Sequence, residues 1–175
     1  VKTFQRDDIT IYFGDVLDCF SQIPDETIDL VFADPPYNLG KKFKGAKDRF
    51  SPVAYLEWMK SWIKEIDRVV TPNGSVYLMN STQNLAAMEF ICRESFFIQS
   101  TIAWVYDSSS VQAKKRFGSS WEPILFMTKD KKNYTFNHQD ILVETITGAK
   151  RGLIDYRKAP PRPYSKTKVP TNVWQ

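Results

Sequence analysis

The chain has 175 residues, the length of one domain, and its 42% hydrophobic content is sufficient for a packed core. Its formal net charge is only +4, and two distant cysteines with one histidine exclude a zinc site of usual spacing and indicate free thiols in a reducing compartment. No apolar stretch has the length of a membrane span and the N-terminus carries no signal-peptide core, so we expect a cytoplasmic protein.

The first half of the chain alternates β-rich and helical patterns. Residues 9–13 and 27–33 are predicted as strands, and the helical spacing of 16–23 between them indicates a βαβ unit with a parallel sheet. A capping serine and a first-turn proline then begin a helix over 51–70.

The later elements change in character along the chain. A Pro-Asn-Gly turn is predicted at 72–74, followed by a buried strand at 75–79 and a helix at 85–92. Two further strands at 97–105 and 122–128 are separated by a long polar segment, which is typical of an antiparallel hairpin with a functional or disordered loop. The predicted fold class is α/β, with a mostly parallel, doubly wound sheet that carries an antiparallel hairpin.

Positive charge is concentrated near the C-terminus. Residues 150–168 contain seven Lys or Arg and one acidic residue, whereas the rest of the chain has 17 basic and 19 acidic residues. Such a segment is typical of a phosphate-binding surface, although a solvated basic tail has the same composition.

The segment Asp34-Pro35-Pro36-Tyr37-Asn38-Leu39-Gly40 directly follows a predicted buried strand, at the point where open α/β sheets bind ligands. Its residue types suit methyl transfer to the exocyclic amino group of a flipped base. Asp34 can accept a hydrogen bond from the amine and stabilise the positive charge that develops on it. The Pro35 carbonyl can accept the second amino hydrogen, Pro36 stiffens the turn, and Tyr37 offers a stacking face. An ordinary strand-to-loop turn would use similar residues.

Several segments together resemble the DNA amino-methyltransferases, which methylate adenine N6 or cytosine N4 with S-adenosylmethionine. The order of motifs is similar to the β-type arrangement, in which the catalytic motif precedes the cofactor motif. Asp34 favours adenine, because cytosine-N4 members more often have Ser there, and the likeness is strongest to bacterial orphan-type adenine enzymes. The segments that carry the resemblance are 12–15, 29–38, 73–82, 104–129 and 132–137.

The resemblance implies a Rossmann-like methyltransferase, with a catalytic subdomain at 1–130 and part of the target-recognition region at 131–175. Its cofactor would be S-adenosylmethionine and its partner double-stranded DNA, in the bacterial cytoplasm at the nucleoid, either as an orphan enzyme or in restriction-modification. Many relatives form dimers. The candidate cofactor-binding residues are Asp15, Asp34, Asn80 and Ser81. An aspartate such as Asp15 is equally well explained as a helix N-cap.

Basic residues in two loops and the tail are candidates for contacts with DNA phosphates, and solvated loops are the alternative. Trp58 and Trp62 are four residues apart on a predicted helix, so we expect them in the core. Trp104 and Trp121 flank the polar loop, and either core packing or base contact fits them. The candidate DNA-binding residues are Lys41, Lys42, Lys114, Lys115, Arg116, Lys150, Arg151, Arg157 and Lys158.

One departure from the family pattern bears on function. The sequence ends at Gln175, before the His-Pro-Thr-Gln-Lys-Pro-like segment and the Phe-x-Gly-x-Gly cofactor loop of β-type members, and its seven glycines form no Gly-x-Gly. We therefore expect a fragment of a longer protein, with a natural truncation as the alternative. Cytosine-N4 methylation and a catalytically inactive DNA-binding fragment are alternative functions. Methylation of RNA or of a protein glutamine fits less well, because those relatives more often have Asn in place of Asp34.

Overall fold

The computed structural model describes residues 1–41, 48–106, 114–115 and 117–175. They form two compact units, which are Val1–Thr135 with Val173–Gln175, and Phe136–Asn172. Within the described ranges, no helix is both long enough and apolar enough to cross a membrane.

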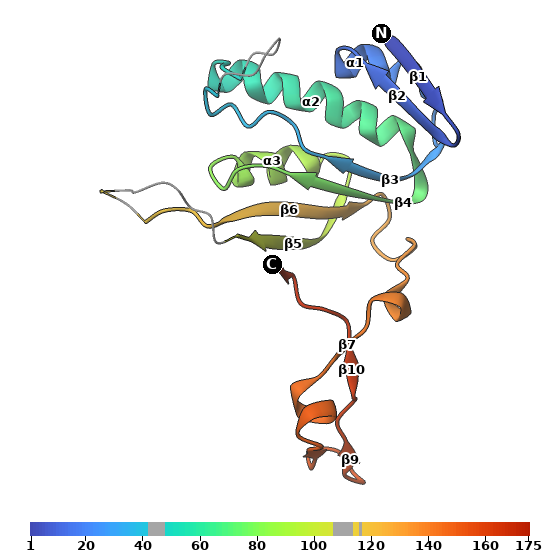
Figure 1. Cartoon of the computed structure of the whole chain (residues 1–175), viewed down its shortest axis with the longest axis vertical. Coiled ribbons are helices and arrows are strands. Elements are labelled where there is room, and N and C mark those ends of the chain that lie inside the picture. The colour runs from blue at the N-terminus through green and yellow to red at the C-terminus, as the bar shows by residue number, and fades with distance from the viewer. Residues whose placement is uncertain (42–47, 107–113, 116) are drawn as a thin grey trace. The chain divides into compact units, whose positions relative to one another are not determined.

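The first unit is built on a five-stranded sheet with the order β11-β5-β6-β4-β3 (Figure 1). The strands are β3 (Ile28–Ala33), β4 (Val70–Met79), β5 (Phe97–Val105), β6 (Trp121–Thr128) and β11 (Val173–Trp174). β3 is parallel to β4 and β11 is parallel to β5, whereas β6 is antiparallel to both of its neighbours. The predicted hairpin is confirmed as β5 and β6. The sheet is mixed rather than mostly parallel, because the returning strand of this hairpin lies between β5 and β4.

The N-terminal strands form a separate hairpin of β1 (Lys2–Arg6) and β2 (Ile9–Phe13). The predicted βαβ unit that joins 9–13 to 27–33 is therefore wrong, because β2 pairs with β1. The two strands are adjacent in sequence and meet through a tight turn in which Asp7 has a φ of +50°. The parallel crossover of the first unit is formed instead by β3, α2 (Pro52–Val69) and β4.

Among the described residues of the first unit, the α-helices that accompany the strands are α1 (Val16–Phe20), α2 (Pro52–Val69) and α3 (Leu85–Cys92). The predicted start of α2 is confirmed, because the Ser51 hydroxyl accepts a hydrogen bond from the Ala54 amide at 3.2 Å. Apolar residues at helical spacing on α2 are buried as predicted, and Trp62 is among them.

All three helices pack against one core cluster, which contains the fully buried Met59, Leu78 and Leu125. A smaller cluster that includes Phe126 and Met79 lies apart from it. Side chains alternate between the faces of a strand, so neighbouring residues such as Leu78 and Met79 belong to different clusters. In the described residues the helices thus cover one face of the sheet, and the predicted doubly wound arrangement is not observed there. The mixed sheet with its helices remains of the Rossmann-like type.

The Pro-Asn-Gly segment forms an irregular part of β4 rather than the predicted turn. Ile28 pairs with Val70, and Leu30 pairs with Ser75. The two residues of β3 are two positions apart, whereas their partners in β4 are five positions apart. The extra residues are accommodated as a bulge, where a proline without an N–H is tolerated. A β-carbon on Gly74 would lie 2.9 Å from the Asp29 carbonyl oxygen, so this close approach requires glycine.

The second unit consists of short elements held by two antiparallel strand pairs. These are β7 (Val143–Glu144) with β10 (Thr167–Lys168), and β8 (Ile154–Asp155) with β9 (Arg162–Pro163). The Thr145 hydroxyl donates to the Ser165 carbonyl at 2.6 Å and accepts from the Gly148 amide at 3.0 Å. A β-carbon on Gly148 would overlap the backbone of Ser165. The elements are η1 (His138–Ile141), β7 (Val143–Glu144), η2 (Ile146–Lys150), β8 (Ile154–Asp155), β9 (Arg162–Pro163) and β10 (Thr167–Lys168).

The Cys92 thiol gives a prediction about this core. Burial raises the pKa of Cys92 from 9.0 to about 12, with a further contribution from the charge of Glu89. The folded state therefore retains a proton that the unfolded state releases above about pH 9. We expect the contribution of the Cys92 thiol to the free energy of unfolding to be fully present below pH 9 and to be lost as the pH rises through 12.

The two cysteines should also differ in reactivity. At pH 8, iodoacetamide should label the partly exposed Cys19 well before the buried Cys92. Equal labelling rates in the native protein would contradict this burial.

Candidate active site

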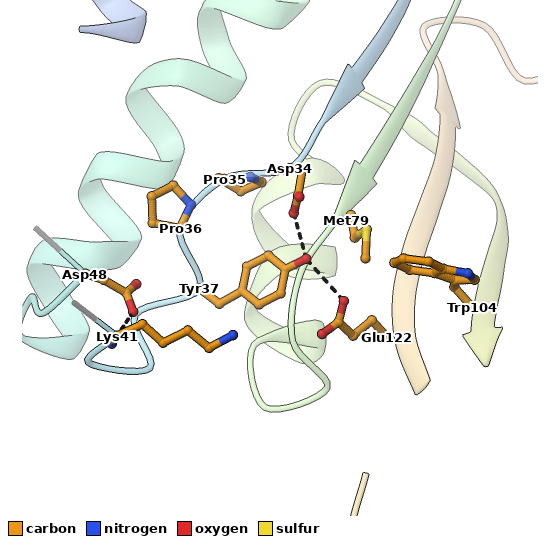
Figure 2. Close-up of a pocket in the computed structure, with 9 residues that line it drawn as sticks. All are labelled: Asp34, Pro35, Pro36, Tyr37, Lys41, Asp48, Met79, Trp104 and Glu122. Carbon is orange, nitrogen blue, oxygen red and sulfur yellow. Dashed lines mark hydrogen bonds between the residues drawn. The ribbon is translucent and has the colours of Figure 1, made fainter. Parts of the chain in front are cut away.

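The motif residues lie where the sequence places them, directly after β3 at its carboxyl end. They line a cavity of about 500 Å³ (Figure 2). β4, β5 and β6 contribute the opposite side of the cavity through Met79, Trp104 and Glu122. The full lining consists of Asp34, Pro35, Pro36, Tyr37, Lys41, Asp48, Met79, Trp104 and Glu122.

The Tyr37 hydroxyl lies between two carboxylates in this cavity (Figure 2). It donates to Asp34 Oδ1 at 2.7 Å, and Glu122 Oε2 is 3.4 Å from the same oxygen. Burial raises the pKa of Tyr37 above its ordinary value, and the hydrogen bond to Asp34 and the charges of both carboxylates raise it further. The phenol therefore remains a neutral hydrogen-bond donor throughout the physiological pH range.

A buried carboxylate fixes the loop after the motif. Asp48 is only 3% exposed, and its two oxygens accept from the amides of Asn38 and Lys41, each at 2.7 Å. Asn38 has a φ of +59°, a left-handed conformation that asparagine tolerates well. Its side chain bonds the Phe50 backbone twice, accepting from the amide at 2.7 Å and donating to the carbonyl at 3.2 Å. The turn is thus held by the Asn38 side chain from within it and by the Asp48 side chain from further along the chain.

Two side chains of the helical layer hold the motif's carbonyl groups. The Tyr55 hydroxyl of α2 donates to the Pro36 carbonyl at 2.8 Å, and Asn84 Nδ2 donates to the Tyr37 carbonyl at 2.8 Å. Asn80 joins these two donors, since its Nδ2 donates to the Tyr55 hydroxyl at 3.0 Å and its Oδ1 accepts from Asn84 at 2.8 Å. This network fixes the motif backbone through hydrogen bonds within the protein itself.

The candidate cofactor residues occupy different environments. Asp34 lines the cavity, whereas Asn80 and Ser81 are 0% and 7% exposed and do not line it. The Ser81 hydroxyl has no hydrogen-bond partner within the described part of the chain. Asp15 caps α1, because its Oδ1 accepts from the Leu17 amide at 2.9 Å, which is the structural role that the sequence left open for it.

A second cavity of about 340 Å³ shares Asp34, Pro35 and Pro36 with the first. Its other walls are apolar and come from α1, β3 and α2, including Trp58 and Trp62. The Trp62 Nε1 atom is buried and has no acceptor among the described residues. The two cavities therefore meet at the motif. The buried indole donor belongs to Trp62, which lines the second cavity.

The candidate DNA-binding residues are distributed over both units. Lys42 and Arg116 lie outside the described residues, and the others are exposed. Arg157 is already paired, since its guanidinium donates to Asp155 at 2.8 and 3.1 Å and to the Tyr164 hydroxyl at 3.2 Å. The exposed candidates are Lys41, Lys114 and Lys115 in the first unit, and Lys150, Arg151, Arg157 and Lys158 in the second.

Sequence reasoning missed four residues that shape the site. Asp48, Tyr55 and Asn84 hold the motif backbone, and Glu122 approaches Tyr37 although 85 residues separate them. Glu122 is the one charged residue of β6, a signal that could have identified it. Asp48 has no comparable signal, because it lies in a segment of mixed charge.

The comparison with protein families identifies the group to which this fold and site correspond. The family model described as "DNA methylase" (N6_N4_Mtase) matches residues 28–175. The chain belongs to this family of DNA methylases. Its match therefore includes the motif, the walls of the cavity and the whole second unit.

Individual proteins are similar to this DNA methylase over different shares of their length. DNA adenine methyltransferase YhdJ of Escherichia coli K12 is 53% identical over 165 residues, which are 94% of this chain and 56% of YhdJ. The chain thus spans little more than half the length of that relative.

Solved structures show the fold. The cytosine-N4-specific PvuII DNA methyltransferase superposes with a TM-score of 0.56 at 22% identity, covering 69% of this chain and 49% of its own. TTHA0409 of Thermus thermophilus, assigned as a DNA modification methylase and complexed with S-adenosyl-L-methionine, gives 0.54 at 19% identity. That match covers 73% of this chain and 56% of TTHA0409. The Rossmann-like methyltransferase fold is thereby confirmed.

Proposed function

We propose that this DNA methylase transfers a methyl group from S-adenosylmethionine to the N6 amino group of adenine in specific DNA sequences. The observation that carries the proposal is the Asp34 carboxylate at the end of β3, in a cavity that also contains Tyr37. Sequence identity to YhdJ, a DNA adenine methyltransferase, supports adenine as the base. Cytosine-N4 methylation has weaker support, since the likeness to the PvuII enzyme concerns the fold alone.

The residues of the first cavity suit the requirements of amine methylation. The amino nitrogen is a weak nucleophile, because its lone pair is delocalised into the base. Asp34 accepts a hydrogen bond from the amine and stabilises the positive charge that develops on the nitrogen. Within the described residues no donor occupies the Pro35 carbonyl, so it is available for the second amino hydrogen. Tyr37 and the partly exposed Trp104 supply aromatic faces for the base.

The second cavity fits the methyl donor by the chemistry of its walls. S-adenosylmethionine supplies an activated methyl group together with an aromatic adenine ring and polar acceptor atoms. Apolar and aromatic side chains suit such a ring, and the buried Nε1 donor of Trp62 has no partner among the residues that the structure describes. We assign Asp34, Trp58 and Trp62 to the cofactor, together with Asp15, which directly precedes the cavity residue Val16. We give Asn80 and Ser81 a supporting position behind the motif.

Exposed basic residues would bind DNA phosphates from both units. We assign residues 1–130 to catalysis and 131–175 to target recognition. The substrate is double-stranded DNA in the bacterial cytoplasm, at the nucleoid, and we propose that two copies of the protein form a dimer.

Because Arg157 is neutralised by Asp155, its loss should weaken DNA binding less than the loss of Lys158.

One experiment tests the proposed reaction directly. The full natural protein is incubated with tritium-labelled S-adenosylmethionine and genomic DNA from a methylation-deficient host, and the nucleosides are separated after digestion. We expect label in N6-methyladenine, and sequencing of the modified sites gives the target. Label in N4-methylcytosine would assign the chain to cytosine instead. Absence of transfer would leave DNA binding without catalysis as the better description.

A further inference from the structure

The Tyr37 hydroxyl has one proton and two carboxylate acceptors. Asp34 Oδ1 lies at 2.7 Å, a short charge-assisted hydrogen bond, whereas Glu122 Oε2 at 3.4 Å is at the limit of a hydrogen bond. The hydroxyl can donate to only one of them at a time. Tyr37 therefore occupies the carboxylate that the proposed reaction assigns to the target amine.

An amine that enters this cavity competes with Tyr37 for Asp34. The phenol and the amine are both donors, and both approach the carboxylate from the cavity that Asp34, Tyr37 and Glu122 line together. Releasing the phenol without another acceptor would leave a half-buried hydroxyl unpaired, which opposes amine binding. The Tyr37 backbone is held by Asn84, so a change of acceptor needs only a movement of the side chain.

We propose that Glu122 is a positioning residue, which accepts the Tyr37 hydroxyl when the target amine takes its place on Asp34. This assignment rests on the proposed function and extends it to a residue of β6. The Glu122 carboxylate points toward the phenol from across the cavity (Figure 2). Glu122 lies in a regular part of the sheet, where it pairs with Trp104 of β5. Its approach to Tyr37 is therefore fixed by the sheet rather than by a loop.

The charged groups that line the cavity favour this change of hydrogen-bond acceptor by Tyr37. Two carboxylates share one neutral phenol, and a developing positive charge on the amine is favoured by both. Lys41 is the cation among the described residues that line the cavity, and its backbone amide is bonded to Asp48. Glu122 thus contributes to amine binding through Tyr37, without touching the reacting nitrogen.

The test compares two duplexes that differ only in the target amine. One contains the methylation site with adenine, and the other has purine, which lacks the 6-amino group, at the same position. We expect Glu122→Ala to raise the dissociation constant of the full natural protein for the adenine duplex by about tenfold, the factor for one unpaired hydroxyl. Binding of the purine duplex should be unchanged, because no amine displaces Tyr37 from Asp34.

Two further variants separate positioning from a structural role. Glu122→Gln retains an acceptor and should restore most of the affinity for the adenine duplex. Tyr37→Phe removes the hydroxyl and keeps the ring, so Glu122→Ala should have no additional effect in that background. An equal loss for both duplexes, or a loss that persists beside Tyr37→Phe, overturns the assignment. A wild-type protein that methylates no adenine overturns the proposed function, and the assignment with it.

Discussion

Replacement of Asp34 by alanine should lower the rate of methyl transfer by about 10²–10³-fold, the loss measured when one preorganised electrostatic partner of a transition state is removed. The carboxylate lies at the end of β3 and lines both cavities, so it is the group that can contact amine and donor together. Single-turnover transfer of tritium to DNA, at saturating cofactor, measures this loss on the chemical step.

This prediction has two control variants. One changes a carboxylate on the same strand, β3, and the other changes Asp34 itself. Asp29→Asn changes an exposed carboxylate of β3, which accepts a weak hydrogen bond from the Thr71 hydroxyl at 3.3 Å. This variant should leave the rate of methyl transfer within about twofold of the wild-type rate, as expected for a neutral surface change. Asp34→Asn keeps an acceptor oxygen and loses the charge, so its rate should fall between those of wild type and Asp34→Ala. If Asp34→Ala transfers methyl groups at the wild-type rate, the assignment of Asp34 is wrong.

Replacement of Asn80 by alanine should lower the free energy of unfolding by about 2–3 kcal/mol, because buried partners would lose their hydrogen bonds. Asn80 is completely buried and bonds Tyr55, Ser81 and Asn84, which link α2, the end of β4 and the start of α3. Urea unfolding monitored by tryptophan fluorescence measures the change. Asn73→Ala, at an exposed residue with one weak side-chain bond, should change the stability by about 0.5 kcal/mol or less.

The same variant distinguishes a supporting role of Asn80 from direct contact with the cofactor. If Asn80 supports the motif, its loss should reduce stability and catalysis together, and Tyr55→Phe should do the same to a smaller extent because it releases the Pro36 carbonyl. A decrease in affinity for S-adenosylmethionine at unchanged stability would instead show that Asn80 binds the cofactor. Isothermal titration with S-adenosylmethionine provides the affinity.

Elements with a strong local pattern could be predicted from the sequence. The helix α2 has a serine cap, a proline in its first turn and apolar residues at helical spacing, and the structure confirms each of these. The hairpin of β5 and β6 also follows from two β-rich segments adjacent in the chain. The pairing of β2 could not be predicted in this way, because its partner β1 is exposed and has only one apolar residue, so the sequence does not indicate a strand there.

The proposed reactive group can be read from the sequence alone, since Asp34 to Tyr37 follow a strand and have the residue types that amine methylation requires. The surroundings of that group depend on the tertiary fold. Asp48, Asn84 and Glu122 reach the motif from 10 to 85 residues away in the chain. Such contacts depend on the order and register of the strands and on how the helices pack over them. Local propensity does not specify these, so the second carboxylate beside Tyr37 became visible only once the sheet had brought β6 opposite the end of β3.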